Sequence, residues 1–385
     1  VPDPRALAIR DDVAFFQAVR AALIKTTGDG EHYVEDVEHA TPLGDLVAGF
    51  MPRRVFPPGQ VPSYSNYGAS LAGYIVEQVS GEPYDQYIER HILQPLGMDR
   101  STLYQELPDE LAADLSLSYQ YNQYNGEYQP LPVEWMYIRP AGGLMAPGVD
   151  MGKFMLAHLQ DGEYNGVRIL QPETAQLMHT QSYAFDPQLS GSAHGFIEST
   201  VKGRRLIGHG GAFNGWMTTL QLIPEEHAGI YVSANSWVNQ EVLDKMVQMF
   251  MDRYFPAPEA ISDSNPAATS IAAGDNLSRY TGVYVSSRKN FSTPEKLQAL
   301  STMTWVGSSP EITLRFPHLL RPHTESWVYV RPLVFQNALT GELAIFKEDE
   351  HGQVRYLSVE NEPFRILIKQ PCYGYIGLLL FGLLT

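Results

Sequence analysis

Apolar positions recur at helical intervals in several segments of the first two thirds of the chain. Leu71, Ile75 and Val79 belong to one such stripe and predict a helix over 67–79, which ends at Gly81. Similar patterns predict further helices over 1–50 (with a break at 28–30), 84–93, 150–160, 172–179 and 243–254.

The hydrophobic period changes between residues 196 and 234. Short apolar runs separated by turn residues predict strands over 196–201, 205–208, 217–223 and 230–234. With the helices around them, these strands predict an α/β (α+β) domain over 1–255, in which an antiparallel sheet is flanked by helices. Residues 103–140 are rich in Tyr and Gln and are expected to form loops.

Residues 256–277 divide the chain, because they carry Pro, Ala and Ser without a hydrophobic period and so predict a linker. Strand-like runs then alternate with turns and predict an all-β, barrel-like domain over 278–370. The apolar tail 371–385 is either a buried strand followed by a loose end or the start of a membrane helix.

Charge and cysteine content exclude several classes of protein. The net charge of −16 disfavours nucleic acid or an anionic membrane surface as a partner, since both require a basic patch. The single cysteine, Cys372, excludes an internal disulfide and a cysteine-based zinc site. We therefore expect neither a metal nor any other cofactor.

Two short motifs carry candidate chemistry. Tyr64-Ser65-Asn66 directly precedes the helix over 67–79, so a phenol and an amide can face one cleft. His209-Gly210-Gly211 follows an apolar run, and its glycines would let a substrate approach a strand edge whose N–H groups bind an oxyanion. Each motif alone also fits a simpler structure: a helix cap formed by Asn66, and a surface turn or β-bulge.

The order of these motifs matches a known family. Segments 56–60, 64–68, 71–77, 95–98, 141–144 and 208–211 resemble the serine β-lactamase-like and penicillin-binding-protein-like hydrolases, most closely the class C and esterase-type branch. The resemblance covers about 45–255 and implies a β-lactamase/transpeptidase-like fold. The region after the linker resembles the lipocalin-like domain that is often appended to these enzymes.

The resemblance also implies roles for the motif residues. In this family a serine at a helix N-terminus attacks the carbonyl, and a lysine one turn later helps to remove its proton. By motif match, Tyr64 would be the base or proton shuttle and Asn66 the substrate clamp. His209, Gly210 and Gly211 would form the strand edge that completes the oxyanion hole.

The expected nucleophile is missing from its usual place, because residues 1–63 contain no Ser-x-x-Lys. Ser199/Lys202, on a strand entering a turn, and Ser286/Lys289, in a loop after the linker, have the spacing and are interpreted as chance. The nucleophile is therefore unidentified. Either the chain is a C-terminal fragment, or it is a degenerate homologue that binds without turnover.

These observations predict a serine hydrolase that transfers an acyl group from an ester, a D-amino-acid peptide or a β-lactam. A histidine, unlike a lysine, is mostly neutral at pH 7, so His209 favours an esterase or peptidase over a β-lactamase. The alternative is a non-catalytic binding or envelope-associated module. Expected partners are a small-molecule or peptide substrate, a membrane contacted by 371–385, and another chain that covers an exposed sheet edge. The expected location is the bacterial periplasm, the extracellular space or a membrane anchor.

Overall fold

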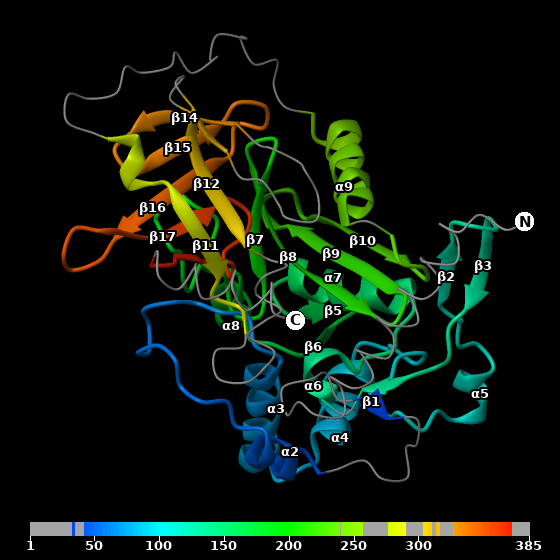
Figure 1. Ribbon diagram of the computed structural model, residues 1–385. Coiled ribbons are helices and arrows are strands. Elements are labelled where there is room, and N and C mark those ends of the chain that lie inside the picture. Colours follow the sequence, from blue (N-terminus) through cyan, green and yellow to red (C-terminus); the bar gives the residue numbers. More distant parts are fainter. Residues whose placement is uncertain are drawn as a thin grey trace, which may run out of the picture.

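The computed structural model describes residues 33–34, 42–136, 138–238, 240–256, 276–289, 303–309, 313–315 and 326–371. Within these ranges, Figure 1 shows an antiparallel sheet flanked by helices and, beside it, a β-barrel. The predicted tail after 371, most of the predicted linker and most of the helical pattern before 42 lie outside the described residues.

The main helices agree with the apolar spacing. The described helices and helical turns are α2 Leu43–Gly49, α3 Asn66–Ser80, α4 Tyr84–Ile88, η2 Glu89–Leu93, α5 Asp109–Ala112, α6 Arg139–Gly142, α7 Gly148–Leu159, α8 Pro172–His179, η3 Pro224–Glu226, α9 Gln240–Tyr254 and η4 Leu277–Arg279. The cap of α3 is Ser65, not Asn66: the Ser65 Oγ accepts a hydrogen bond from the Gly68 N–H at 3.0 Å. None of the helices in the described ranges has the length and apolarity needed to cross a bilayer.

The central sheet is an antiparallel meander in the order β10-β9-β8-β7. Its strands are β7 Ile197–Val201, β8 Arg204–Phe213, β9 Trp216–Ile223 and β10 Ala228–Ala234. Strand β8 extends beyond the predicted strand 205–208. This extension was not predicted because residues 208–211 have no alternation of apolar and polar side chains. The motif His209-Gly210-Gly211 therefore lies inside a strand and pairs with β9, rather than in a turn.

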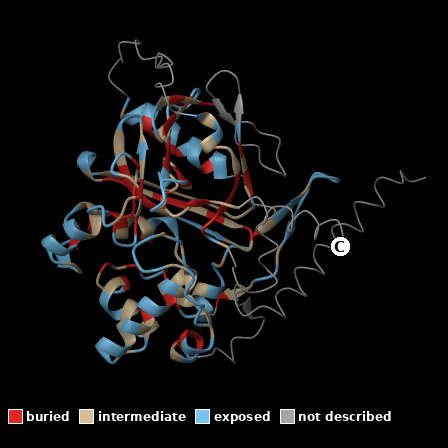
Figure 2. Ribbon diagram, turned by 60° about the vertical axis from the view of Figure 1, so that its left-hand side comes forward, coloured by how far each residue is buried: buried red, intermediate tan, exposed pale blue. Residues whose placement is uncertain are grey.

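Alternating side chains of this sheet pack against helices on opposite faces. Leu206 packs with Val247 of α9, while the next residue, Ile207, packs with Met155 of α7. Successive residues of a strand point to opposite faces, so both faces are covered and the sheet is the middle of three layers. Figure 2 shows the resulting band of buried residues along the strands.

The expectation of loops over 103–140 was wrong in part. This region also contains a hairpin of β2 (Tyr119–Asn122) and β3 (Glu127–Pro130), and β4 (Trp135–Met136), which pairs with β1 (Tyr33–Val34). The residues of β2 and β3 are exposed or only half-buried, so no hydrophobic alternation marks them. A further short hairpin joins β5 (Glu163–Tyr164) to β6 (Val167–Arg168).

The barrel closes by antiparallel pairing of its first and last described strands. The strands are β11 Gly282–Ser286, β12 Thr304–Ser309, β13 Thr313–Arg315, β14 Ser326–Arg331, β15 Val334–Asn337, β16 Leu343–Glu348, β17 Val354–Val359 and β18 Leu367–Lys369. This confirms the predicted all-β, barrel-like domain. Fully buried aromatic side chains, including Tyr284, Trp327 and Phe335, fill its interior. Membership of the lipocalins stays a prediction.

A shared apolar cluster joins the barrel to the rest of the chain. Phe185 and Leu189 pack against Val334, Ile345 and Ile366 of the barrel. The barrel also contacts the segment that leads to α3, because the Ser287 hydroxyl donates to the Pro62 carbonyl oxygen at 3.1 Å. The barrel therefore helps to hold the backbone just before Tyr64 in place.

The buried His158 and the half-buried His179 lie together between α7, α8 and the sheet. The Nδ1 of His158 is 3.2 Å from the Nε2 of His179, and the Phe196 ring contacts both imidazoles. Burial, with the neighbouring His179 in second place, lowers the pKa of His158 to about 4. In the unfolded chain His158 therefore binds a proton near pH 6.5, whereas in the folded chain it binds this proton only near pH 4.

We expect acid to destabilise the fold through this pair. Stability should fall as the pH drops from about 6.5 to about 4, by at most roughly 3 kcal/mol from His158. Urea unfolding across this range measures the effect. A His158→Gln variant should lose part of the pH dependence, and an unchanged slope in that variant would contradict the assignment to His158.

Candidate active site

A cleft of about 1190 Å³ lies where the sheet, the α6 segment and the barrel meet. All the predicted site residues line it, namely Tyr64, Asn66, His209, Gly210 and Gly211. The structure thus brings together two motifs that are far apart in the sequence. Their catalytic roles stay predictions.

Three side chains surround the ring of Tyr64. Its centroid lies 5.8 Å from that of His209 on β8 and 6.0 Å from that of Phe364, which stands edge-on. The Cζ of Arg288 lies 4.7 Å from the Tyr64 ring centroid. Phe364 and Arg288 belong to the barrel part of the chain, so the barrel contributes directly to the surroundings of the candidate base.

Asn66 enters the cleft because of the way α3 begins. It is the first helical residue, and Ser65 before it has an extended backbone (φ −142°, ψ 113°). Tyr64 and Asn66, on either side of this cap, both line the cleft. The local sequence therefore fixes the phenol and the amide side by side.

The glycine-containing part of β8 has an open edge. Strand β7 ends its pairing at Ile197 opposite Gly208, whereas β8 continues to Phe213 along β9. Within the described ranges, residues 209–212 pair with β9 alone, and they also line the cleft. Free backbone groups of this edge can pair with an extended substrate or hold an oxyanion.

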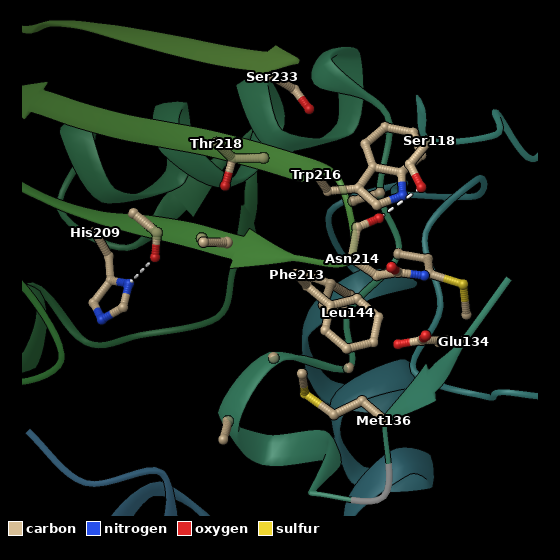
Figure 3. Close-up of a pocket in the computed structure, with 18 of the residues that line it drawn as sticks. Ser118, Glu134, Met136, Leu144, His209, Phe213, Asn214, Trp216, Thr218 and Ser233 are labelled. Carbon is tan, nitrogen blue, oxygen red and sulfur yellow. Dashed lines mark hydrogen bonds between the residues drawn. The ribbon is translucent and has the colours of Figure 1, made fainter. Parts of the chain in front are cut away.

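His209 is held beside this edge. Its Nδ1 lies 2.6 Å from the carbonyl oxygen of Gly210, which accepts a hydrogen bond from that nitrogen. Figure 3 shows this contact at one end of the cleft. At the other end, Phe213, Leu144 and Met136 gather into an apolar group.

The floor of the cleft is fixed by polar contacts that the sequence did not reveal. The Gln105 side chain donates to the Gly143 carbonyl oxygen at 3.2 Å and accepts from the Met136 N–H at 2.8 Å. Arg139 of α6 pairs with Asp85 of α4 at 2.7 Å. Burial raises the pKa of Asp85, although Arg139 opposes the shift. These contacts hold 141–144 against the cleft.

Neither Ser-Lys spacing found in the sequence forms a helical pair. Ser199 lies in β7, and Lys202 lies in the following turn and pairs with Asp252 at 3.0 Å. Ser286 was wrongly placed in a loop: it is the last residue of β11, is buried and lines the cleft. Its hydroxyl accepts from the Arg288 N–H at 3.1 Å, and burial lowers the pKa of Lys289.

Other serines also line the cleft, but none of them is followed by a lysine one helical turn later within the described part of the chain. They are Ser116, Ser118 and Ser233. The Ser118 hydroxyl donates to the Asn214 carbonyl oxygen at 2.6 Å, as Figure 3 shows. The described residues therefore do not identify the nucleophile.

The fold and the cleft are those of a β-lactamase/transpeptidase-like protein. Residues 41–249, more than half of the chain, match the Beta-lactamase family, and the chain belongs to that family. This confirms the resemblance drawn from the ordered motifs.

Curated relatives cover the same region. Penicillin-binding protein 4 of Amycolatopsis lactamdurans is 27% identical over 221 residues, which are 52% of this chain and 56% of that protein. A putative D-alanyl-D-alanine carboxypeptidase of Escherichia coli O157:H7 is 24% identical over 212 residues, 47% of this chain and 46% of that protein. The chain spans about half the length of these two relatives.

The likeness to a solved structure extends further along the chain. The crystal structure of SurE has a TM-score of 0.57 at 19% identity and covers 90% of this chain and 77% of its own. At this identity the likeness concerns the fold alone.

Proposed function

We propose that the protein is a serine hydrolase that acts by acyl transfer on a small-molecule or peptide substrate. The observation that carries the proposal is the placement of Tyr64 beside the open edge of β8 in one cleft. Membership of the Beta-lactamase family supports it. The substrate would be an ester, a D-amino-acid peptide or a β-lactam.

The proposed reaction has two steps. A serine oxygen bonds to the substrate carbonyl carbon while Tyr64, in its phenolate form, takes the serine proton, and the β8 edge holds the oxyanion. The bond to the leaving group then breaks, and Tyr64 returns the proton to that group. Water hydrolyses the resulting seryl ester by the same sequence, which restores the serine. Asn66 would hold the substrate amide or carbonyl.

Labelling with a fluorophosphonate probe tests the proposal and identifies the nucleophile. We expect one serine of the intact protein to be labelled, and prior incubation with penicillin or an acyl-D-Ala-D-Ala peptide to block the label. Mass spectrometry of proteolytic fragments locates the adduct. Heat-unfolded protein is the control for non-specific reaction.

One observation favours a second candidate, a non-catalytic binding module. Within the described residues no cleft serine begins a helix with a lysine one turn later, since Ser286, which Lys289 follows at this spacing, is the last residue of strand β11. This candidate predicts that the folded protein binds penicillin or the peptide reversibly and takes up no fluorophosphonate.

We also propose a place in the bacterial envelope, for which the two bacterial relatives above are the support. Cell fractionation tests it. A partner for the sheet edge belongs to the same proposal, because β10 pairs with β9 alone within the described strands. A monodisperse monomer in light scattering would contradict that partner.

A further inference from the structure

Strand β10 is an outer strand of the central sheet, and in the part of the chain that the structure describes it pairs with β9 alone (Figure 1). None of its seven residues, Ala228–Ala234, is charged or a proline. Natural edge strands commonly carry charges, prolines or bulges, because an unprotected edge pairs with another chain. The sequence of β10 therefore leaves this edge open to strand pairing.

Every second residue of β10 turns its backbone groups to the open edge. Ile230 is opposite Gln221 of β9, and the Gln221 carbonyl oxygen points to β10, since it would lie 2.9 Å from a Cβ at Gly229. Ile230 and the other even-numbered residues therefore pair with β9 through their backbone groups. The N–H and C=O groups of Gly229, Tyr231 and Ser233 face outwards.

The end of the strand agrees with this alternation. Asn235 is the next odd-numbered residue, and its carbonyl oxygen accepts a hydrogen bond from the Tyr119 N–H of β2 at 2.8 Å. Because this contact occupies the edge at residue 235, a further strand can pair with residues 228–234 and not beyond them.

The residues of β10 follow nearly the same order of sizes in both directions from Tyr231. Ile230 and Val232 are both β-branched, residues 229 and 233 are glycine and serine, and both ends are alanine. Two copies paired antiparallel about a two-fold axis at Tyr231 place residues of similar size opposite each other. The outward-facing groups are symmetric about the same residue, so each N–H meets a C=O of the second copy.

Helix α9 adds apolar surface beside this edge. Val242, Met246 and Met249 recur at helical spacing on one side of the helix and are 49%, 45% and 60% exposed. Asp252, on the other side, pairs with Lys202 of the β7–β8 turn at 3.0 Å, so the apolar side is turned towards β10. A two-fold axis perpendicular to the sheet brings both copies of α9 onto the same face, where burial of these side chains stabilises the contact.

Charge does not oppose a contact at this edge. Two copies with a net charge of −16 repel each other, so a contact between them needs a surface without acids. Glu225 and Glu226 precede β10, and in the antiparallel pair they lie beyond Ala234 of the second copy, near the uncharged residues 235–236. Glu226 is also paired with Arg204 at 2.7 Å.

We propose that the partner of the β10 edge is a second copy of this chain, which joins the two four-stranded sheets into one continuous sheet about a two-fold axis at Tyr231. The inference rests on the edge partner of the proposed function and identifies it. It does not depend on the hydrolase chemistry.

A cysteine on the axis tests the register of this pairing. In a Cys372→Ser background, Tyr231→Cys is expected to give a covalent dimer on a non-reducing gel after treatment with oxidised glutathione. A residue opposite its own copy in a hydrogen-bonded pair has a Cα separation of about 5.5 Å, which suits a disulfide. Val232→Cys is the matched control and should stay monomeric on the gel, because residue 232 lies opposite residue 230 of the second copy.

Sedimentation over a concentration series measures the dimer in solution. The Ser233 N–H faces outwards, so Ser233→Pro removes a donor to the second copy and spares the pairing with β9. Each dimer loses this donor twice, and we expect its Kd to rise about 10- to 100-fold. Ile75→Lys changes the other exposed apolar helix, α3, at a residue that is 53% exposed, and should leave the Kd unchanged.

The outcomes separate this inference from the hydrolase proposal. A monomeric intact protein would overturn the inference, as would a dimer that Ile75→Lys weakens and Ser233→Pro does not. Circular dichroism shows whether each variant is folded, and the cysteine pair decides the register if Ser233→Pro fails to fold. Fluorophosphonate labelling of the intact protein is measured in parallel: a labelled monomer supports the hydrolase and rejects the dimer, and an unlabelled dimer does the reverse.

Discussion

Replacing Tyr64 by phenylalanine is expected to lower kcat/KM about 10²- to 10⁴-fold while leaving the melting temperature nearly unchanged. The variant loses only the hydroxyl that would carry the proton. The ring contacts with His209, Phe364 and Arg288 do not need that hydroxyl and should survive. Hydrolysis of an acyl-D-Ala-D-Ala peptide and of a chromogenic ester measures the loss.

Tyr128→Phe is the matched control, because Tyr128 lies on the exposed hairpin strand β3 and is not among the residues that line the cleft. It should retain full activity. If Tyr64→Phe turned over both substrates as fast as the unmodified protein, Tyr64 would not be the base or proton shuttle. If both tyrosine variants were equally impaired, the loss would not be specific to the cleft.

Two glycines of β8 are expected to respond differently to substitution by alanine: the Gly208 variant should lose stability, and the Gly210 variant should lose activity. A Cβ at Gly208 would lie 2.0 Å from the Leu220 carbonyl oxygen, so the backbone of β8 or β9 must shift. Such overpacking of a buried position costs about 1–3 kcal/mol, and we expect Gly208→Ala to lower the melting temperature by roughly 2–12 °C.

Gly210→Ala should leave the fold intact. Its Cβ would stand 3.4 Å from the Thr218 carbonyl oxygen, an ordinary contact, and the residue is exposed in the cleft. We expect an unchanged melting temperature but a kcat/KM reduced about 10-fold or more, since a methyl group hinders the approach of a substrate backbone. Equal melting temperatures of the two variants, or full activity of Gly210→Ala, would contradict the assignment of this edge.

Elements were predicted where their own residues carry a hydrophobic pattern, and they were missed where no such pattern exists. Helix α3 was predicted from Leu71, Ile75 and Val79 because helical spacing is a local property, but those residues are partly or largely exposed in the described structure. The β2–β3 hairpin was missed because neither of its faces is buried, so its sequence shows no alternation of apolar and polar residues. The extent of β8 was missed because glycines carry no side chains to alternate.

The residues of the site also fall into those that the sequence indicated and those that only the structure revealed. Tyr64 and Asn66 are neighbours through the chain, and the family resemblance associated them with His209. Gln105, Phe364 and Arg288 gave no signal, because they reach the cleft only through long-range packing. A serine with its lysine was not found by either route within the described residues.

The sequence by itself determined the main helices, the position of the central strands, the all-β part that follows them and the family, since periodicity and short motifs are written in consecutive residues. Only the tertiary structure decided what surrounds the phenol. Closing the barrel and packing Phe185 and Leu189 against it bring Arg288 over Tyr64. That contact joins residues that lie far apart in the sequence, because burial of apolar surface between domains does not depend on distance along the chain.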